Sequence, residues 1–329
     1  MRLLFALLPI LLILSGCSFP PPAISSSSPG LSIQGILHGG KQPVVDAHVY
    51  LLAANTTGYG QPSASLLNAS STGASDAIGA YVTTSSTGAF SITGDYACTP
   101  NTQVYVYALG GNPGAGVNSA AGFLALLGNC PNSGNFLTAV PYIWVDEVST
   151  IAAAYAFTGF ATDPTHVSSS GTALAQTGIQ NAFANAANLV DLSNGVALDT
   201  TPAGNGSVPQ REINTLANIL ASCVNSTGPS SPACSTLFSN SLSKGSSGAI
   251  PTNTADAAIN IAHNPGTNIA TLFALTTPAS PFQPVLPSAP GNFTIRVEFA
   301  EPAGPIHGPN AVAIDRPMPW AAPLTSTTR

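Results

Sequence analysis

The sequence VVDAHVYLLA, residues 44–53, decides the fold class of this chain. Its β-branched, aliphatic and aromatic side chains are the composition of a buried β-strand. Similar runs recur in LSIQGIL (31–37), GAFSIT (88–93) and QVYVYAL (103–109), and residues typical of turns separate them. We therefore predict an antiparallel β-sandwich over residues 31–140.

A helical period replaces the strand period after Asp146. Apolar residues recur there at the i, i+3, i+4 and i+7 positions that form one face of a helix. Asp146 and Glu147 open the first of these segments, where acidic side chains complement the helix N-terminus. Adjacent helical side chains point roughly 100° apart, so we interpret the two acids as helix-end electrostatics rather than as a catalytic pair. We predict a small all-α domain over residues 145–277, which makes the chain an α+β multidomain protein.

Three groups of strand residues follow one another in a specific order. Gly35-Ile36-Leu37 precedes Pro43-Val44, which leads to Ala47-His48-Val49, and Thr87-Gly88-Ala89-Phe90-Ser91-Ile92 comes later. This order resembles the carboxypeptidase-regulatory-like family of transthyretin-like and Cna-B-like β-sandwiches, although the aspartate that the family places before the last motif is missing. The resemblance implies a binding or spacer module without catalysis.

The composition is unusually poor in charge. Charged residues make up 6% of the 329 residues, whereas about a quarter is usual. Solubility must then depend on hydroxyl and amide groups, which suits a location outside the cytoplasm. The 7 basic residues are scattered singly against 13 acidic ones, so no cationic stripe is present to neutralise phosphates. We expect no nucleic acid partner.

The N-terminus has the organisation of an export signal. Arg2 precedes an apolar run, Leu3–Leu14, that is too short to span a bilayer, and Leu-Ser-Gly-Cys follows, ending at Cys17. This resembles the bacterial lipoprotein signal, the lipobox, in which the cysteine sulfur receives a diacylglyceryl group and the peptide is cut before it. The alternative is an ordinary signal peptide with an incidental cysteine.

The lipobox implies a membrane lipid partner through an acylated Cys17. Residues 1–16 would be the signal peptide, and the Pro/Ser stretch over 17–30 would be a tether. Ser18 after the cysteine resembles lipoproteins sent to an outer membrane, so we expect a cell-envelope protein that faces the periplasm or the surface.

Four cysteines remain once Cys17 is assigned to the anchor. An even number in an exported chain indicates disulfides. Of the three possible pairings we favour Cys98–Cys130 and Cys223–Cys234, because each closes a loop within one predicted domain. The chain has no C-x-x-C motif and its five histidines lie far from these cysteines, so we predict no metal site.

The C-terminal residues 278–329 combine several signals. Five prolines between Pro278 and Pro290 predict a linker, and the alternation over 293–299 predicts one strand. HGPNAVAID, 307–315, resembles the opening of an NHL-type propeller blade, but a blade needs about 40 residues and the rest is missing. The order of elements resembles lipoproteins of acidobacteria. We expect a natural short form or a truncated reading frame.

Other candidate sites are weaker. The glycines at Gly114 and Gly116 lack the third glycine of a dinucleotide site, so we predict a loop that leads to a short helix over AAGFLALLG, residues 120–128. No serine lies in G-x-S-x-G, which leaves no basis for a hydrolase triad. His38 and His48 would bind a metal only if they faced each other across a hairpin. Tyrosines within residues 104–109 would form a sugar-stacking platform if they were exposed.

These patterns favour one functional class. We expect a lipid-anchored cell-envelope protein with a non-catalytic binding or structural role, no cofactor, and an envelope polysaccharide or protein as partner. Two alternatives remain open. One is a truncated member of an NHL-propeller lipoprotein family whose recognition or enzymatic domain is missing, and the other is a carbohydrate-binding adhesion module.

Overall fold

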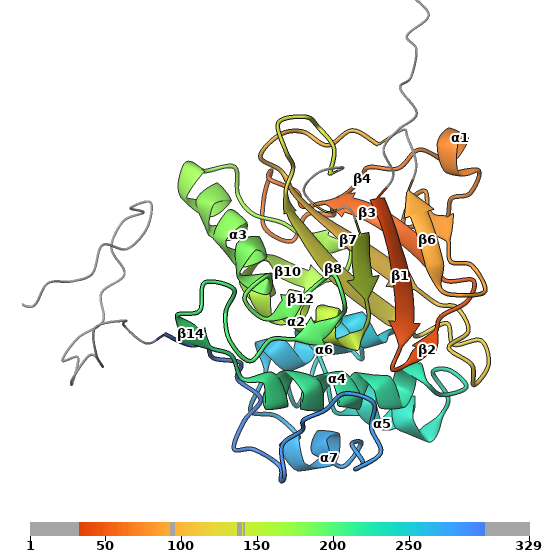
Figure 1. The fold of residues 1–329 in the computed structure, drawn as a ribbon, viewed down its shortest axis with the longest axis vertical. Coiled ribbons are helices and arrows are strands. Elements are labelled where there is room, and N and C mark those ends of the chain that lie inside the picture. Colours follow the sequence, from red (N-terminus) through yellow and green to blue (C-terminus); the bar gives the residue numbers. More distant parts are fainter. Residues whose placement is uncertain (1–32, 93–95, 137–139, 141, 300–329) are drawn as a thin grey trace, which may run out of the picture.

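The computed structural model describes residues 33–92, 96–136, 140 and 142–299. It has mixed α and β structure, with mostly antiparallel sheets (Figure 1). The predicted signal peptide, the predicted lipid anchor at Cys17, the predicted tether and the HGPNAVAID segment lie outside the described residues. Among the described helices, none has both the length and the apolar character needed to cross a membrane.

The smaller of the two main sheets is centred on β1. This strand pairs antiparallel with β2 and β6 and parallel with β9, so a strand beyond the predicted sandwich joins the sheet. The turn between β1 and β2 consists of Gly40 and Lys41 alone, because Gly39 pairs with Gln42. The strands are β1 (Ile33–Gly39), β2 (Gln42–Pro43), β6 (Ala89–Ile92) and β9 (Tyr142–Val145).

The larger sheet has five strands. Its order is β4-β3-β7-β8, and β5 also pairs with β3. The strands are β3 (His48–Ala53), β4 (Ala64–Ser65), β5 (Val82–Thr83), β7 (Gln103–Leu109) and β8 (Gly122–Asn129). Strand β8 corrects the predicted short helix at residues 120–128, because residues 122–129 form a ladder with β7 instead.

Both faces of the larger sheet are covered. Val49 and Leu51 share a core cluster with β1 residues of the smaller sheet. Tyr50 and Leu52 point to the opposite face and share a second cluster with the helices. Since successive strand residues point to opposite faces, coverage on both sides explains why these strands are apolar without interruption.

Six helices lie against the second face or beside it. They are α2 (Glu147–Ala156), α3 (Ala173–Ala186), α4 (Gln210–Val224), α5 (Pro232–Ser239), α6 (Thr254–His263) and α7 (Ile269–Phe273), while the short α1 (Ala69–Thr72) buries nothing. Figure 1 shows α4 to α7 gathered below the sheets. Side chains of Thr172, Ser231 and Asn253 accept backbone hydrogen bonds as the N-caps of α3, α5 and α6.

The helices do not form a core of their own. Ile151, Phe183 and Leu216 belong to the same cluster as Tyr105 and Leu124 of the larger sheet. Each of the two core clusters therefore contains residues from both sides of positions 140–145. The physical reason is that the second face of the sheet is as apolar as the first and has to be covered.

The segment after α7 packs on the same core instead of forming a free linker. Phe293 is fully buried, and the Tyr155 hydroxyl donates to its carbonyl oxygen at 2.6 Å. The predicted strand over 293–299 is shorter in the structure. Only Glu298–Phe299 forms a strand, β15, which pairs with β14 (Gly206–Ser207). The remaining short elements are a 3₁₀ turn (Thr158–Phe160), β10 (Ala161–Asp163), β11 (His166–Val167), β12 (Val190–Asp191) and β13 (Val196–Ala197).

Two disulfides close loops of different length. Cys98–Cys130 joins the segment before β7 to the end of β8, with a sequence separation of 32. Cys223–Cys234 joins the end of α4 to α5, with a separation of 11. These are the two pairs favoured from the sequence.

Candidate functional site

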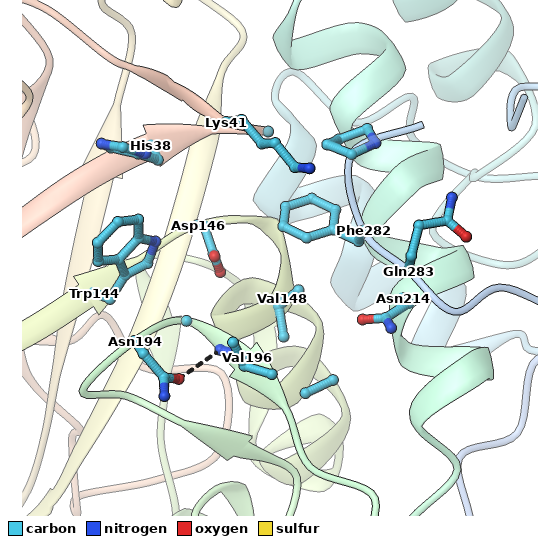
Figure 2. Close-up of a pocket in the computed structure, with 14 residues that line it drawn as sticks. His38, Lys41, Trp144, Asp146, Val148, Asn194, Val196, Asn214, Phe282 and Gln283 are labelled. Atoms are coloured by element: carbon cyan, nitrogen blue, oxygen red, sulfur yellow. Dashed lines mark hydrogen bonds between the residues drawn. The ribbon is translucent and has the colours of Figure 1, made fainter. Parts of the chain in front are cut away.

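A pocket of about 370 Å³ lies where four parts of the chain meet (Figure 2). The β1–β2 turn, the junction of β9 and α2, the turn between β12 and β13, and residues 281–283 beside α4 form its walls. Trp144 and His38 lie on one side of the view, Phe282 and Asn214 lie on the other, and Asp146 lies between them. The pocket combines aromatic rings with polar groups, as ligand sites usually do.

Asp146 is held at the pocket by the start of α2. Its carboxylate oxygen Oδ1 accepts from the Ser149 backbone N–H at 2.9 Å, and the Ser149 hydroxyl oxygen accepts from the Asp146 N–H at 3.0 Å. This reciprocal arrangement is a capping box, which the sequence Asp-Glu-Val-Ser provides. The Ser149 hydroxyl also donates to the Leu124 carbonyl at 2.8 Å, so the helix start is fixed to β8.

Burial changes the protonation of Asp146. The residue is only 2% exposed, and desolvation raises the pKa of its carboxyl to about 7. Hydrogen bonds from the Ser149 and Val148 backbone and from the Trp144 side chain lower the pKa, but by less than burial raises it. Near neutral pH the carboxyl is therefore partly protonated. In that form it can donate a hydrogen bond as well as accept one.

Gly195 brings a second turn against the same carboxyl. Its φ is 70°, and an added Cβ would lie 2.5 Å from Asp146 Oδ2 and 2.2 Å from Trp144 Cδ1. Asn194, beside it, accepts from the Val196 N–H at 3.1 Å, which Figure 2 marks with a dashed line. Only glycine combines this backbone conformation with so close an approach.

Glu147 is buried next to Asp146 but does not line the pocket. Its two carboxylate oxygens accept from the Gly40 backbone N–H at 3.0 and 2.9 Å. Burial, followed by the charge of Asp146, raises its pKa well above the ordinary value. Glu147 thus connects the start of α2 to the β1–β2 turn that forms the pocket rim.

Several polar groups at the pocket have no partner among the described residues. Asn214 donates its Nδ2 to the Pro284 carbonyl and Gln283 donates its Nε2 to the Ser280 carbonyl, so the amide oxygens of both side chains have no donor there. The imidazole of His38 packs on Trp144 at 4.6 Å between ring centroids, and burial lowers its pKa, which favours the neutral form. The pocket therefore offers mainly neutral donors and acceptors.

Other residues proposed from the sequence lie elsewhere. Tyr105 and Tyr107 are 0% and 2% exposed because the helices cover their face, so the condition for a sugar-stacking platform on this strand, exposed tyrosines, is not met. Gly114 and Gly116 lie in the loop between β7 and β8, where their N–H groups donate to the Asn112 side chain at 2.8 and 3.1 Å.

The two strand histidines belong to different sheets. His38 lies on β1 and His48 on β3, so they do not face each other across one hairpin. The Nδ1 of His48 lies 3.2 Å from Asp76 Oδ2, and its ring stacks on Tyr81 at 3.7 Å. Within the described ranges, no group of three or more His, Cys, Asp or Glu side chains has the arrangement to hold a metal ion.

The pocket itself was not evident from the sequence. Lys41, Trp144, Asn214 and Phe282 come from four distant segments, and no local motif connects them. The one available signal was the Asp146–Glu147 pair. Comparison with protein-family models, with curated proteins and with solved structures gave no match for this chain.

Proposed function

We propose that this protein is a lipid-anchored, non-catalytic binding protein of the cell envelope and that its pocket binds a carbohydrate. The observation that carries the proposal is the pairing of two aromatic rings, Trp144 and Phe282, with unpartnered amide oxygens around one cavity. Sugars offer hydroxyl groups to such oxygens and apolar C–H faces to such rings.

The anchor part of the proposal rests on the lipobox at Cys17. Two or three acyl chains on this residue would hold the protein on a membrane, since each buried CH₂ contributes about 0.8 kcal/mol. Two disulfides support an exported location, because such bonds persist in oxidising compartments. In this proposal the two packed sheets are a transthyretin-like sandwich, and residues 17–30 separate it from an outer membrane.

Binding is favoured over catalysis by the acids at the pocket. Glycoside hydrolysis usually needs two carboxyl groups that flank the scissile bond. Asp146 is the only carboxyl among the described lining residues, and the Glu147 carboxylate is bound to the Gly40 N–H. The pocket can therefore orient a sugar by hydrogen bonds, but it lacks the second acid of a hydrolase.

A glycan array tests the carbohydrate part. The purified full-length protein should bind at least one class of glycan, and Trp144→Ala should abolish that binding because the aromatic face is lost. Tyr59→Ala is the matched control, since Tyr59 is 58% exposed and lies outside the pocket. Retention of binding in Trp144→Ala would place the site elsewhere, and an array without any bound glycan would refute the proposed function.

Labelling with palmitate tests the anchor. Wild-type cells should incorporate the label into this protein and retain it in the membrane fraction. The Cys17→Ala variant should do neither. Incorporation of label into Cys17→Ala would refute the lipid anchor while leaving the pocket proposal intact.

A further inference from the structure

A second cavity of about 370 Å³ adjoins the first. The two share Gly40, Lys41 and Pro281 in their walls. The β1–β2 turn lies close to Pro281, as shown by the 3.2 Å that would separate a Cβ added to Gly40 from Pro281 Cγ. The β1–β2 turn and Pro281 therefore stand at the middle of one groove with a chamber on each side.

The second chamber is lined by neutral polar side chains. Asn218, Ser222 and Asn225 of α4 and its C-cap face it, together with hydroxyls of Thr277 and Ser280. No acidic residue is among its described lining residues. The chamber thus shares side-chain amides with the first, adds hydroxyl groups, and has no negative charge among its described lining residues.

Lys41 is the cation at the junction. The described ranges contain four lysines and arginines. Arg296 pairs with Glu298 at 2.9 Å and Arg211 donates to the Val285 carbonyl at 3.0 Å. The ammonium groups of the exposed Lys41 and Lys244 have no partner among the described residues, and of these two lysines only Lys41 lines the two cavities. In a chain with only 6% charged residues, an unpaired cation shared by two chambers is available for a ligand.

The two carboxyl groups on the nearby helix do not counter this cation strongly. Burial raises the pKa of both Asp146 and Glu147, so each carries less negative charge near neutral pH than an exposed acid would. Glu147 is also bound to the backbone of Gly40, not to the Lys41 side chain.

We propose that the groove binds an extended acidic polysaccharide, with a carboxylate-bearing sugar unit at Lys41 and neighbouring units in the two chambers. This inference rests on the proposed carbohydrate-binding function and names its ligand class. A lysine ammonium is a compact point charge that attracts a sugar carboxylate, while the chambers supply hydrogen bonds to uncharged units.

Titration calorimetry with defined oligosaccharides tests the inference on the full-length protein. The acidic probes are oligomers of galacturonate, guluronate and glucuronate-containing hyaluronan, each from one to six units, and the neutral probes are cello-, malto- and xylo-oligomers of the same lengths. At least one acidic series should bind more tightly than every neutral series, affinity should rise beyond a single unit, and added salt should weaken binding.

Three variants separate the contributions. Lys41→Gln should weaken binding of the acidic oligomers roughly 2- to 5-fold and leave neutral binding about unchanged. Lys244→Gln removes another exposed lysine, which lies outside the groove, and should change neither. Ser222→Phe should fill the second chamber. Affinity should then no longer rise with oligosaccharide length, while the affinity for a single sugar unit should remain that of the wild type.

The outcomes distinguish this inference from the proposed function. Equal affinity for neutral and acidic oligomers, or unchanged acidic binding in Lys41→Gln, would overturn the acidic ligand and leave carbohydrate binding standing. Absence of binding to every probe would overturn the acidic ligand, and together with an array without any bound glycan it would overturn carbohydrate binding as well. A gain with length that survives Ser222→Phe would overturn the assignment of the second chamber.

Discussion

Both carboxylate oxygens of Glu147 accept a hydrogen bond from the backbone N–H of Gly40, at 3.0 and 2.9 Å, across 107 positions of sequence. The contact joins the first turn of α2 to the two-residue turn that carries Lys41. It therefore sets the position of the groove junction relative to the helix that presents Asp146. The pocket depends on this contact although Glu147 does not line it.

Replacement of Glu147 tests this dependence. Glu147→Ala leaves the buried Gly40 N–H without an acceptor and creates a cavity, so we expect the free energy of unfolding to fall by about 2–4 kcal/mol. Glu147→Gln retains one acceptor oxygen and avoids a buried charge, so it should cost less than half as much. Urea unfolding of the three proteins measures both values. Equal losses in the two variants would contradict the role of the hydrogen bond.

Asp146 should make stability depend on pH. Its carboxyl has a pKa of about 7 in the folded protein, against 3.8 for an unperturbed aspartate. Between these values the folded state binds more protons than the unfolded state, so the free energy of unfolding falls as the pH rises from about 4 to about 7 and levels off above.

Asp146→Asn removes this contribution and keeps an N-cap residue of the same size. Between pH 4.5 and pH 7.5 the free energy of unfolding of the wild type should fall by on the order of 3 kcal/mol more than that of the variant. Unfolding at both pH values measures the difference. Burial also raises the pKa of Glu147 and that of Asp256 on α6, and both acids are present in both proteins. Parallel pH profiles would show that Asp146 is ionised throughout.

The strands and most helices were predictable because their signals are local. QVYVYAL is β7, and the apolar spacing around Leu216 belongs to α4. That helices cover the second face of the larger sheet was harder to predict, since a continuous apolar run predicts burial but not the element that covers it. Residues 120–128 misled for the same reason, because a short apolar run fits a helix or a strand.

The site was less predictable than the fold. The adjacent acids at the start of α2 were correctly placed at a helix end, but the sequence did not show that both would be buried. Nor did it show that Phe282, within a proline-rich segment, would lie opposite Trp144. The backbone of that segment is bound by α4 side chains, as when Asn218 donates to the Phe282 carbonyl at 2.8 Å. Such long-range contacts leave no local pattern.

The two disulfides should differ in their effect on stability. Cys98–Cys130 closes a loop with a separation of 32 residues and Cys223–Cys234 one of 11. In the chain-entropy account, the free energy of unfolding should fall by about 4 kcal/mol when both Cys98 and Cys130 are replaced by Ser, and by about 3 kcal/mol when both Cys223 and Cys234 are replaced. Urea unfolding without reductant measures both, and unchanged stability in either double variant would mean that its bond does not constrain the unfolded chain.

A pair of glycines separates backbone strain from pocket geometry. Gly195 and Gly204 have φ of 70° and 72°, but an added Cβ meets Trp144 and Asp146 only at Gly195 and nothing within 4 Å at Gly204. In both Gly→Ala variants the free energy of unfolding should fall by about 1 kcal/mol, because alanine is strained in the left-handed conformation. Gly195→Ala should lose more, because Trp144 has to move.

Glycan binding gives the decisive comparison between these two variants. Displacement of Trp144 removes the aromatic face on which the sugar packs, so Gly195→Ala should weaken binding at least tenfold, which corresponds to about 1.4 kcal/mol. Gly204→Ala should bind as wild type does at a temperature where both variants are folded. Calorimetry with the tightest oligosaccharide measures this, and equal affinity in the two variants would remove Trp144 from the binding site.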